Sequence, residues 1–301
     1  MIEEHQAKVI VRCRDQLGES AFWSPIDKAL YWSDGYAPEL HRFDSVTNTH
    51  TLAAFAFDTP VGVVARALHG FVVGTAGGLH YSNFSGTEVR VIADPEHGRD
   101  GVAYNDGKAD RSGNFWFGSY DTGTIEPRGA FWRLDKGGCT TLVDSGYSIF
   151  NGPAFSPDGQ IAYASDSNAR RIIAYDVSNF PPYLTHRRVF FEMGDIAGLP
   201  DGLTVDAAGG LWCAMWGGYC AIRIDPTGEL TDRVAVSAAH ATSVALGGAD
   251  LRTLFITSAT CELSSDELEE QPDAGCLFGI EVNVPGLPEH PVELFDIAHP
   301  E

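Results

Sequence analysis

Residues 104–121 have the sequence YNDGKADRSGNFWFGSYD, and this stretch contains both halves of the pattern that decides the fold. The first half is a polar segment that contains Asn105, Asp106 and Gly107. The second half is a turn over residues 111–114, followed by an aromatic strand over residues 115–119. Versions of the second half recur along the chain, whereas the Asn-Asp-Gly segment occurs once. A repeated scaffold with one unrepeated polar segment is typical of a functional site built on a repeat fold.

A pair of short hydrophobic runs occurs about six times, at intervals of roughly 40–50 residues. The first runs of the pairs are residues 29–34, 70–74, 115–119, 161–166, 211–215 and 254–258. The second runs are residues 39–44, 78–81, 129–135, 171–176, 220–225 and 276–281. Two such runs joined by a short loop predict a β-hairpin. The period is that of a four-stranded propeller blade.

The repeats therefore predict an all-β fold, a six-bladed β-propeller with four antiparallel strands in each blade. We expect one domain over residues 1–301, because no linker or low-complexity segment divides the chain. The short β-like run around Val9–Val11 is expected to complete the last blade. Residues 262–270 could form one short helix or a charged loop. A pair of β-sandwiches or a β-helix is the alternative, and the regular repeat favours it less.

The composition limits the possible partners. The 301 residues include 41 acidic and 20 basic side chains, a formal net charge of -21. Nucleic acids and anionic membranes bind basic patches, so we expect neither as a partner. The chain opens without a signal-peptide pattern and has no apolar run long enough to span a bilayer, which predicts a cytoplasmic protein. The six cysteines lack CxxC spacing, which favours reduced thiols. Monomer and weak dimer are both consistent with this size.

Four polar positions lie ahead of strands in this framework. They are Glu19, Asn105 with Asp106, Asn151 and Asp201. Three of them precede what the pattern predicts to be the innermost strand of a blade by a similar distance. In a propeller such loops meet at one mouth of the central channel, so we expect these residues to be neighbours. Taken alone, each has a structural explanation, because Asn-Gly and Asp-Gly are common turn dipeptides and Glu19 could be a solvated surface carboxylate.

Glu19, Asn151 and Asp201 offer two carboxylates and an amide oxygen. These are ligands suited to Ca²⁺, Mg²⁺ or Mn²⁺ and acceptable to Zn²⁺. Three protein ligands leave coordination positions for water and substrate. The histidines show no HxH or HExxH spacing, although His240 could face the channel from the loop ahead of the sixth blade. No GxSxG elbow supports a serine nucleophile.

Four phrases occur in a fixed order at blade spacing: LGESAFWSP, YNDGKADRSGNFWFGS, IFNGPAFSPDG with YASDS, and GLPDGLTVDAAGGLW. In these phrases the chain resembles the SMP-30/gluconolactonase/regucalcin-like family, from about Leu17 to the last blade. Members of that family are known as metal-dependent sugar lactonases on six-bladed propellers. The resemblance implies one divalent metal on Glu19, Asn151 and Asp201. It also implies that Asn105 binds substrate and closes the coordination shell, with Asp106 beside it.

The chain departs from the family pattern at two positions. Ala103 stands where several relatives carry arginine, two residues before the Asn-Asp-Gly segment. Gly123 aligns with an acidic residue that some relatives use for substrate, and Tyr120 or Asp121 could replace it. These departures leave the metal ligands intact and affect the specificity for the sugar.

We therefore predict metal-dependent hydrolysis of a sugar aldonolactone, of the gluconolactone or pentonolactone type, to the aldonic acid. The metal would polarise the lactone carbonyl, and Asp201 would take a proton from the attacking water. Three other interpretations remain open. The site could serve a promiscuous esterase or phosphotriesterase, the chain could be a non-catalytic calcium-binding protein, or it could be an interaction propeller without an ion.

Overall fold

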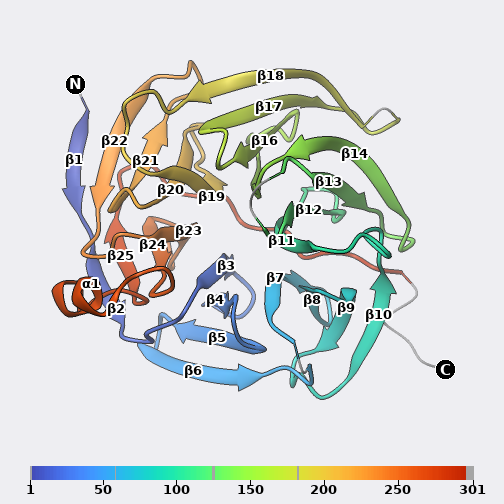
Figure 1. Ribbon diagram of the computed structural model, residues 1–301, viewed down its shortest axis with the longest axis horizontal. Helices are drawn as coiled ribbons and strands as arrows, with labels where there is room; N and C mark the ends of the chain where they lie inside the picture. Colours follow the sequence, from blue (N-terminus) through green and yellow to red (C-terminus); the bar gives the residue numbers. More distant parts are fainter. Residues whose placement is uncertain (1, 58, 124–125, 182, 296–301) are drawn as a thin grey trace.

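The computed structural model describes residues 2–57, 59–123, 126–181 and 183–295, and its strands form six sheets around a central axis (Figure 1). The four strands that form each blade pair antiparallel with their neighbours, which confirms the predicted six-bladed β-propeller with four such strands per blade. The predicted domain range of 1–301 includes Met1 and residues 296–301, which lie outside the described residues. The two N-terminal strands, β1 and β2, join the last two blades.

The blades follow one another in chain order. Blade one consists of β3 (Gly18–Ser24), β4 (Ala29–Asp34), β5 (Glu39–Asp44) and β6 (Thr49–Ala54). Blade two consists of β7 (Val61–Ala67), β8 (Gly70–Thr75), β9 (Gly78–Asn83) and β10 (Val89–Ala93). Blade three consists of β11 (Val102–Ala109), β12 (Phe115–Asp121), β13 (Gly129–Leu134) and β14 (Thr140–Tyr147). Blade four consists of β15 (Phe150–Phe155), β16 (Ile161–Asp166), β17 (Arg171–Val177) and β18 (Leu184–Glu192).

The N-terminal segment completes the last two blades. Blade five consists of β19 (Leu199–Val205), β20 (Leu211–Trp216), β21 (Cys220–Ile224) and β22 (Leu230–Ala235), and blade six of β23 (Ala241–Gly247), β24 (Thr253–Ser258) and β25 (Leu277–Glu281). Strand β2 (Lys8–Val11) pairs with β25 as the fourth strand of blade six, as predicted. Strand β1 (Glu3–Gln6) adds a parallel fifth strand to β22, which was not predicted, because its residues are polar and mostly exposed.

The helical alternative for residues 262–270 is the one observed. Helix α1 (Ser265–Glu270) begins after Ser264, which forms a capping box with Glu267. Within the described residues, no helix is long and apolar enough to cross a membrane.

The first strand of each blade is the innermost one, and this corrects the sequence analysis. Strands β3, β7, β11, β15, β19 and β23 contact one another around the axis (Figure 1). The sequence analysis took the hydrophobic second strands, such as β12, to be innermost and placed the polar site residues on loops before them. Those residues instead lie within the innermost strands. Buried polar side chains interrupt the apolar pattern of these strands, so hydrophobicity alone does not identify them.

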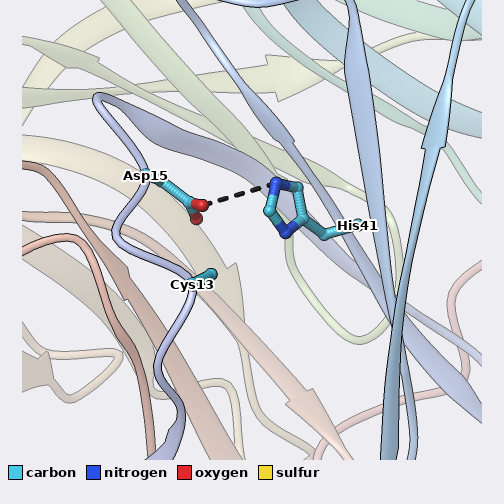
Figure 2. Close-up of side chains that lie close together, drawn as sticks. All are labelled: Cys13, Asp15 and His41. Carbon is cyan, nitrogen blue, oxygen red and sulfur yellow. Dashed lines mark ion pairs between the residues drawn. The ribbon is translucent and has the colours of Figure 1, made fainter.

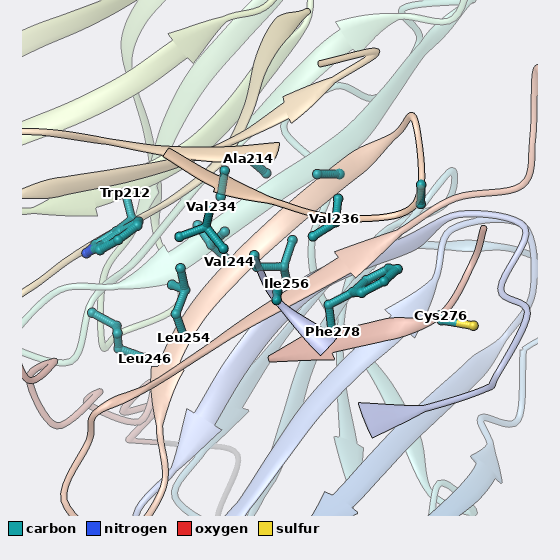
Figure 3. Packing of buried hydrophobic residues seen from close by; sticks show 14 of the residues in the cluster. Trp212, Ala214, Val234, Val236, Val244, Leu246, Leu254, Ile256, Cys276 and Phe278 are labelled. Carbon is teal, nitrogen blue, oxygen red and sulfur yellow. The ribbon is translucent and has the colours of Figure 1, made fainter. Parts of the chain in front are cut away.

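Neighbouring blades are held together by hydrophobic layers. Between blades five and six, side chains from both sheets interdigitate (Figure 3). Blade five contributes Trp212, Ala214 and Val234, and blade six contributes Val244, Leu246, Leu254, Ile256 and Phe278. Because every blade buries both faces in this way, the strands are fixed close to the axis and give the channel rigid walls.

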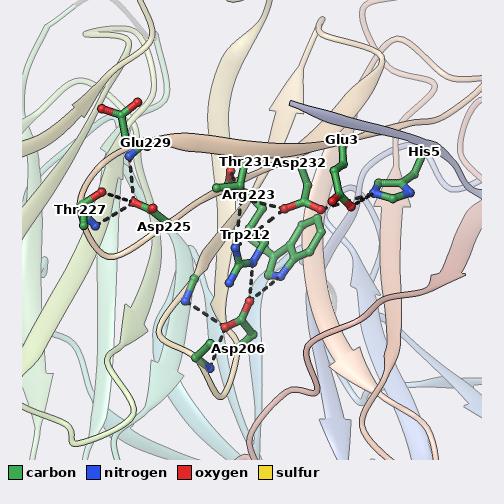
Figure 4. Close-up of polar contacts among 12 residues, drawn as sticks. Glu3, His5, Asp206, Trp212, Arg223, Asp225, Thr227, Glu229, Thr231 and Asp232 are labelled. Carbon is green, nitrogen blue, oxygen red and sulfur yellow. Dashed lines mark hydrogen bonds and ion pairs between the residues drawn. The ribbon is translucent and has the colours of Figure 1, made fainter. Parts of the chain in front are cut away.

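Aspartates hold the turns between the first and second strands of blades three and five. Asp206 accepts hydrogen bonds from the backbone N–H groups of Ala208 and Gly210, and its other oxygen lies 2.6 Å from Arg223 Nε (Figure 4). The Trp212 indole also donates to Asp206, at 3.3 Å. In blade three, the Trp116 indole donates to Asp110 in the same way, at 2.8 Å. This explains why an aspartate six residues before a tryptophan recurs in the sequence.

Candidate metal and substrate site

The predicted site residues lie at backbone irregularities of the innermost strands. The register of β3 against β4 shifts between Glu19 and Phe22. The corresponding shift in β15 follows Asn151, and the shift in β19 lies between Pro200 and Leu203, on either side of Asp201. A β-bulge bends a strand and redirects its side chains. The repeated bulge thus places one polar side chain from each of several blades near the channel.

Glycines after the site residues belong to these bulges. Gly152 has φ +84°, in the left-handed region that favours glycine. Gly202 packs so closely on blade six that a Cβ there would lie 2.9 Å from the Ser243 Cα. Asn-Gly and Asp-Gly dipeptides are typical of turns. At these two positions they instead form bulges in strands that pack closely against a neighbouring blade.

A cavity of about 310 Å³ brings five of the predicted residues together. Glu19, Asn105, Asn151 and Asp201 line it, and Tyr120 lies in its wall. The remaining lining residues are Leu17, Tyr36, Thr122, Ile149, Ser167, Asn168, Leu199, Trp216, Cys261 and Glu262. The cavity therefore combines oxygen donors with apolar and aromatic walls.

Two carboxylates of the cavity are almost completely buried. Glu19 is 7% exposed and Asp201 is 5% exposed. Burial raises the pKa of both carboxyl groups. Repulsion from neighbouring carboxylates raises each pKa further. Asp201 and Asp106 have this effect on Glu19, and Asp106 has it on Asp201. Glu19 accepts a hydrogen bond from the Ser20 N–H at 3.2 Å. Asp201 Oδ1 has no hydrogen-bond partner within the part of the chain that the structure describes.

A hydrogen bond joins the side chains of the two asparagines of the site, Asn105 and Asn151. Asn105 Nδ2 donates to Asn151 Oδ1 and to the Phe150 carbonyl, each at 2.8 Å. Asn151 Nδ2 donates to Ser167 Oγ at 3.0 Å. These bonds fix the Asn151 amide. Its carbonyl oxygen has a second lone pair that remains available to a cation.

This donor set fits a divalent cation. Buried carboxylates that repel one another, one of them with an unpartnered oxygen, are stabilised by a positive charge between them. Carboxylate and amide oxygens are hard ligands, which suit Ca²⁺, Mg²⁺ and Mn²⁺ and are acceptable to Zn²⁺. Glu19, Asn151 and Asp201 are the residues that could hold it. The net charge of -21 also concentrates cations near the protein.

Two of the predicted substrate residues lie elsewhere. Asp106 accepts hydrogen bonds from the backbone N–H groups of Gly107 at 2.8 Å and Gly152 at 2.9 Å, and lines a separate small cavity with Lys108. Burial raises the pKa of Asp106 to about 6. Asp121 faces Arg128, whose Nη1 lies 3.1 Å from its carboxylate. Neither aspartate is among the described residues that line the large cavity.

Sequence reasoning missed the stacked pair at the cavity edge. The Trp216 ring lies 3.9 Å from the ring of His240, nearly parallel to it. Within the described residues, neither nitrogen of His240 has a hydrogen-bond partner, and burial lowers its pKa. The sequence suggested that His240 could face the channel. The sequence does not single out Trp216, because nothing in its strand distinguishes it from the tryptophans of the blade core.

The fold and the cavity together define the class as a six-bladed β-propeller with buried oxygen donors at its central channel. Residues 17–260 match the family described as SMP-30/gluconolactonase/LRE-like region, and the chain belongs to this family. The chain is 32% identical to 6-deoxy-6-sulfogluconolactonase of Pseudomonas putida, over 94% of this chain and 97% of that protein.

Two further relatives cover almost the whole chain. The L-arabinolactonase of Azospirillum brasilense is 36% identical over 94% of each chain. The crystal structure of a calcium-binding protein, regucalcin from Agrobacterium tumefaciens, superposes with a TM-score of 0.91 at 25% identity, over 98% of this chain and 99% of that one. The predicted family and fold are therefore confirmed.

Proposed function

We propose that this protein hydrolyses a sugar aldonolactone to the aldonic acid in a reaction that depends on one divalent cation. Relatives named as sugar lactonases, similar over almost their whole length, support a lactone-hydrolysing enzyme of the esterase type. The observation that carries the cation dependence is the buried Asp201 Oδ1, which has no hydrogen-bond partner among the described residues and shares its cavity with Glu19 and Asn151. Those three residues are the proposed ligands.

The cavity suits a compact ligand that carries many hydroxyl groups. Its volume of about 310 Å³ is at the lower end of the range for small-molecule sites. Asn105 and Tyr120 offer hydrogen bonds to sugar hydroxyls, and Trp216 offers an apolar face. Ala103 pairs with Tyr120 across β11 and β12, so this chain has no arginine side chain beside Tyr120, and this difference alters the choice of sugar.

The chemistry follows from the two carboxylates. When bound, the cation would supply Lewis-acid polarisation of the lactone carbonyl. Asp201 takes a proton from a water that adds to the carbonyl carbon, and the bond from that carbon to the ring oxygen then breaks. The proton held by Asp201 passes to the ring oxygen, which becomes a hydroxyl group, and the former carbonyl carbon becomes a carboxylic acid that releases its proton to the solvent. Asn105 orients Asn151 throughout, through the hydrogen bond between their side chains.

A lactone panel tests this proposal. Purified protein is stripped with chelator and assayed with a pH indicator against 1,4- and 1,5-lactones of pentoses, hexoses and deoxy-sugars, with and without added Ca²⁺, Mg²⁺, Mn²⁺ or Zn²⁺. We expect one or two lactones to be opened far above the spontaneous rate, only when an ion is present. Cation binding without acceleration of any lactone would contradict the proposal and favour a calcium-binding protein, or a phosphotriesterase if aryl phosphotriesters are turned over instead.

A further inference from the structure

A second group of metal-ligating side chains lies away from the channel cavity, where the chain passes from blade six to blade one. Cys13 and Asp15 belong to the segment between β2 and β3, and His41 belongs to β5 (Figure 2). One ligand atom from each of the three lies within 4.8 Å of the others. We call these three residues the N-terminal cluster. None of them is among the described residues that line the channel cavity.

The distance between Asp15 and His41 is unusual for a direct contact. His41 Nε2 lies 3.4 Å from Asp15 Oδ1, which is longer than an ordinary N–H···O hydrogen bond of about 2.7–3.2 Å. Both side chains are 4% exposed, and within the described residues His41 Nε2 has no hydrogen-bond partner. A buried imidazole nitrogen that faces a carboxylate without such a bond is costly, unless something lies between them.

A tetrahedral cation accounts for that separation. Zinc binds imidazole nitrogen and carboxylate oxygen at about 2.0–2.2 Å. Two such ligands on a tetrahedral ion are therefore about 3.4 Å apart. The contact between Asp15 and His41 thus has the length of an edge of a zinc coordination tetrahedron.

The outer atoms of the cluster are already oriented. The Trp32 indole donates to Asp15 Oδ2 at 2.7 Å, which leaves Oδ1 turned toward His41. His41 Nδ1 lies 3.0 Å from His50 Nε2, and this contact fixes the imidazole ring. Metal sites commonly hold their ligands by such outer hydrogen bonds. The Cys13 thiol donates a hydrogen bond to the Gly275 carbonyl at 3.2 Å, which it would give up on binding a cation, and the residue is only partly buried.

We propose that Cys13, Asp15 and His41 form a second cation site, structural rather than catalytic, which takes Zn²⁺ or another ion that prefers thiolate and imidazole. The Cys13 thiol releases its proton on binding, and water completes the four ligands. The ion would tie the segment that closes the ring to the third strand of blade one. The proposal does not depend on the lactonase activity, which involves other residues.

Cobalt absorbance tests the site directly. The full-length, chelator-stripped protein is titrated with Co²⁺, and the thiolate-to-cobalt charge-transfer band and the intense bands of tetrahedral Co²⁺ are recorded. We expect both sets of bands in the wild type and their loss in Cys13→Ser. They should persist in Cys139→Ser, since Cys139 is an exposed cysteine outside the cluster. They should also persist in Cys261→Ser, which removes the thiol at the channel cavity.

Thermal unfolding gives a second measurement. With the channel site kept saturated by Ca²⁺, Zn²⁺ at about one hundred times its Kd for the N-terminal cluster should raise the Tm of the wild type by roughly 5 °C. Cys13→Ser and Cys13→Ala should lose this shift while they keep the metal-free Tm close to that of the wild type. Ca²⁺ and Mg²⁺ should not compete for the cluster, because they bind thiolate poorly.

Three results would overturn the proposal. A wild type without a thiolate-to-cobalt band would show that the cluster does not bind the ion. Bands that survive in Cys13→Ser but disappear in Cys261→Ser would place the thiolate site in the channel cavity. A zinc-induced shift in Tm that is equal in the wild type and both Cys13 variants would remove the structural role.

Discussion

At the scale of single residues, the central feature is that Glu19 and Asp201 are buried as carboxylates close to a third carboxylate, Asp106. The sequence predicted the proximity of Glu19, Asn151 and Asp201, because each precedes a hydrophobic strand at a similar distance. It did not predict that Asn105 would hold Asn151 by a hydrogen bond. Nor did it predict that Asp121 would face Arg128 outside the cavity lining, since the direction of a side chain depends on bulges that the sequence does not reveal.

The burial of Asp201 predicts that the metal-free protein becomes less stable to unfolding as the pH rises. Its pKa is raised above its value in the unfolded chain, so the native state binds more protons than the unfolded state between the two values. The stability contribution of Asp201 is therefore fully present at low pH and is lost as the pH rises through the raised pKa. In chelator-stripped protein at pH 8, Asp201→Asn should be more stable than the wild type, with a Tm higher by roughly 3 °C.

Differential scanning calorimetry of both proteins, in chelator and from pH 5 to 8, checks this expectation. The advantage of the variant should grow with pH and should disappear when a saturating cation is added to the wild type. A variant that is less stable than the wild type at every pH, in chelator, would show that the Asp201 charge is already compensated within the protein.

At the scale of elements, the second and third strands of each blade were predictable and the first strands were not. Hairpins such as β4–β5 and β20–β21 contain short hydrophobic runs between turn signals. Strands β11 and β19 contain Asp106 and Asp201 next to glycines, a combination that is typical of turns. Their strand conformation comes from packing around the axis, which is a long-range effect. Strand β1 was missed for a similar reason, since its pairing with β22 involves residues more than 200 positions apart.

The aspartate turns provide a prediction at this scale. Asp206 is fully buried and pairs with Arg223 as well as holding its own turn. Removal of Asp206 leaves the guanidinium with the more distant Asp232 carboxylate, 3.8 Å from Nη1, so Asp206→Ala should lower the free energy of unfolding by about 3 kcal/mol. Asp225 is the matched control, because it accepts from the N–H groups of Thr227 and Glu229 in an exposed turn. Its replacement should cost about 1 kcal/mol.

Urea denaturation followed by tryptophan fluorescence measures both values. Equal destabilisation by Asp206→Ala and Asp225→Ala would mean that the ion pair with Arg223 adds nothing to the turn. Neither residue lines the channel cavity, so lactone hydrolysis per folded molecule should be unchanged in both variants.

At the scale of the whole molecule, the ring is closed by the N-terminal segment. Strand β2 covers the edge of β25, and β1 covers the edge of β22. Exposed strand edges promote association between chains. Deletion of residues 2–6 removes only β1 and leaves six four-stranded blades, so it should lower the Tm by a few degrees. Deletion of residues 2–11 also opens blade six, and should cause a larger loss of Tm and association that increases with concentration.

Calorimetry and light scattering at several protein concentrations compare the two deletions. If both deletions lower the Tm equally and neither variant associates, the pairing of β2 with β25 does not contribute to the stability of the ring. The closure itself was predicted, because the short β-like run near Val9–Val11 was expected to complete the last blade, and β2 pairs with β25 there.

The central claim is that Glu19, Asn151 and Asp201 hold one divalent cation on which lactone hydrolysis depends. The most direct measurement is one titration that records bound cation and hydrolytic rate together, in the Cys13→Ser background so that only the channel site is counted. The stripped protein receives the ion that restores most activity. The rate should rise in proportion to occupancy and saturate at one ion per chain.

Glu19→Gln should lower kcat/KM by at least about 100-fold at the same ion concentration. The kcat/KM of Asp121→Asn should stay within about twofold of that of the Cys13→Ser protein. Full activity in the stripped protein, or wild-type activity in Glu19→Gln, would contradict the account.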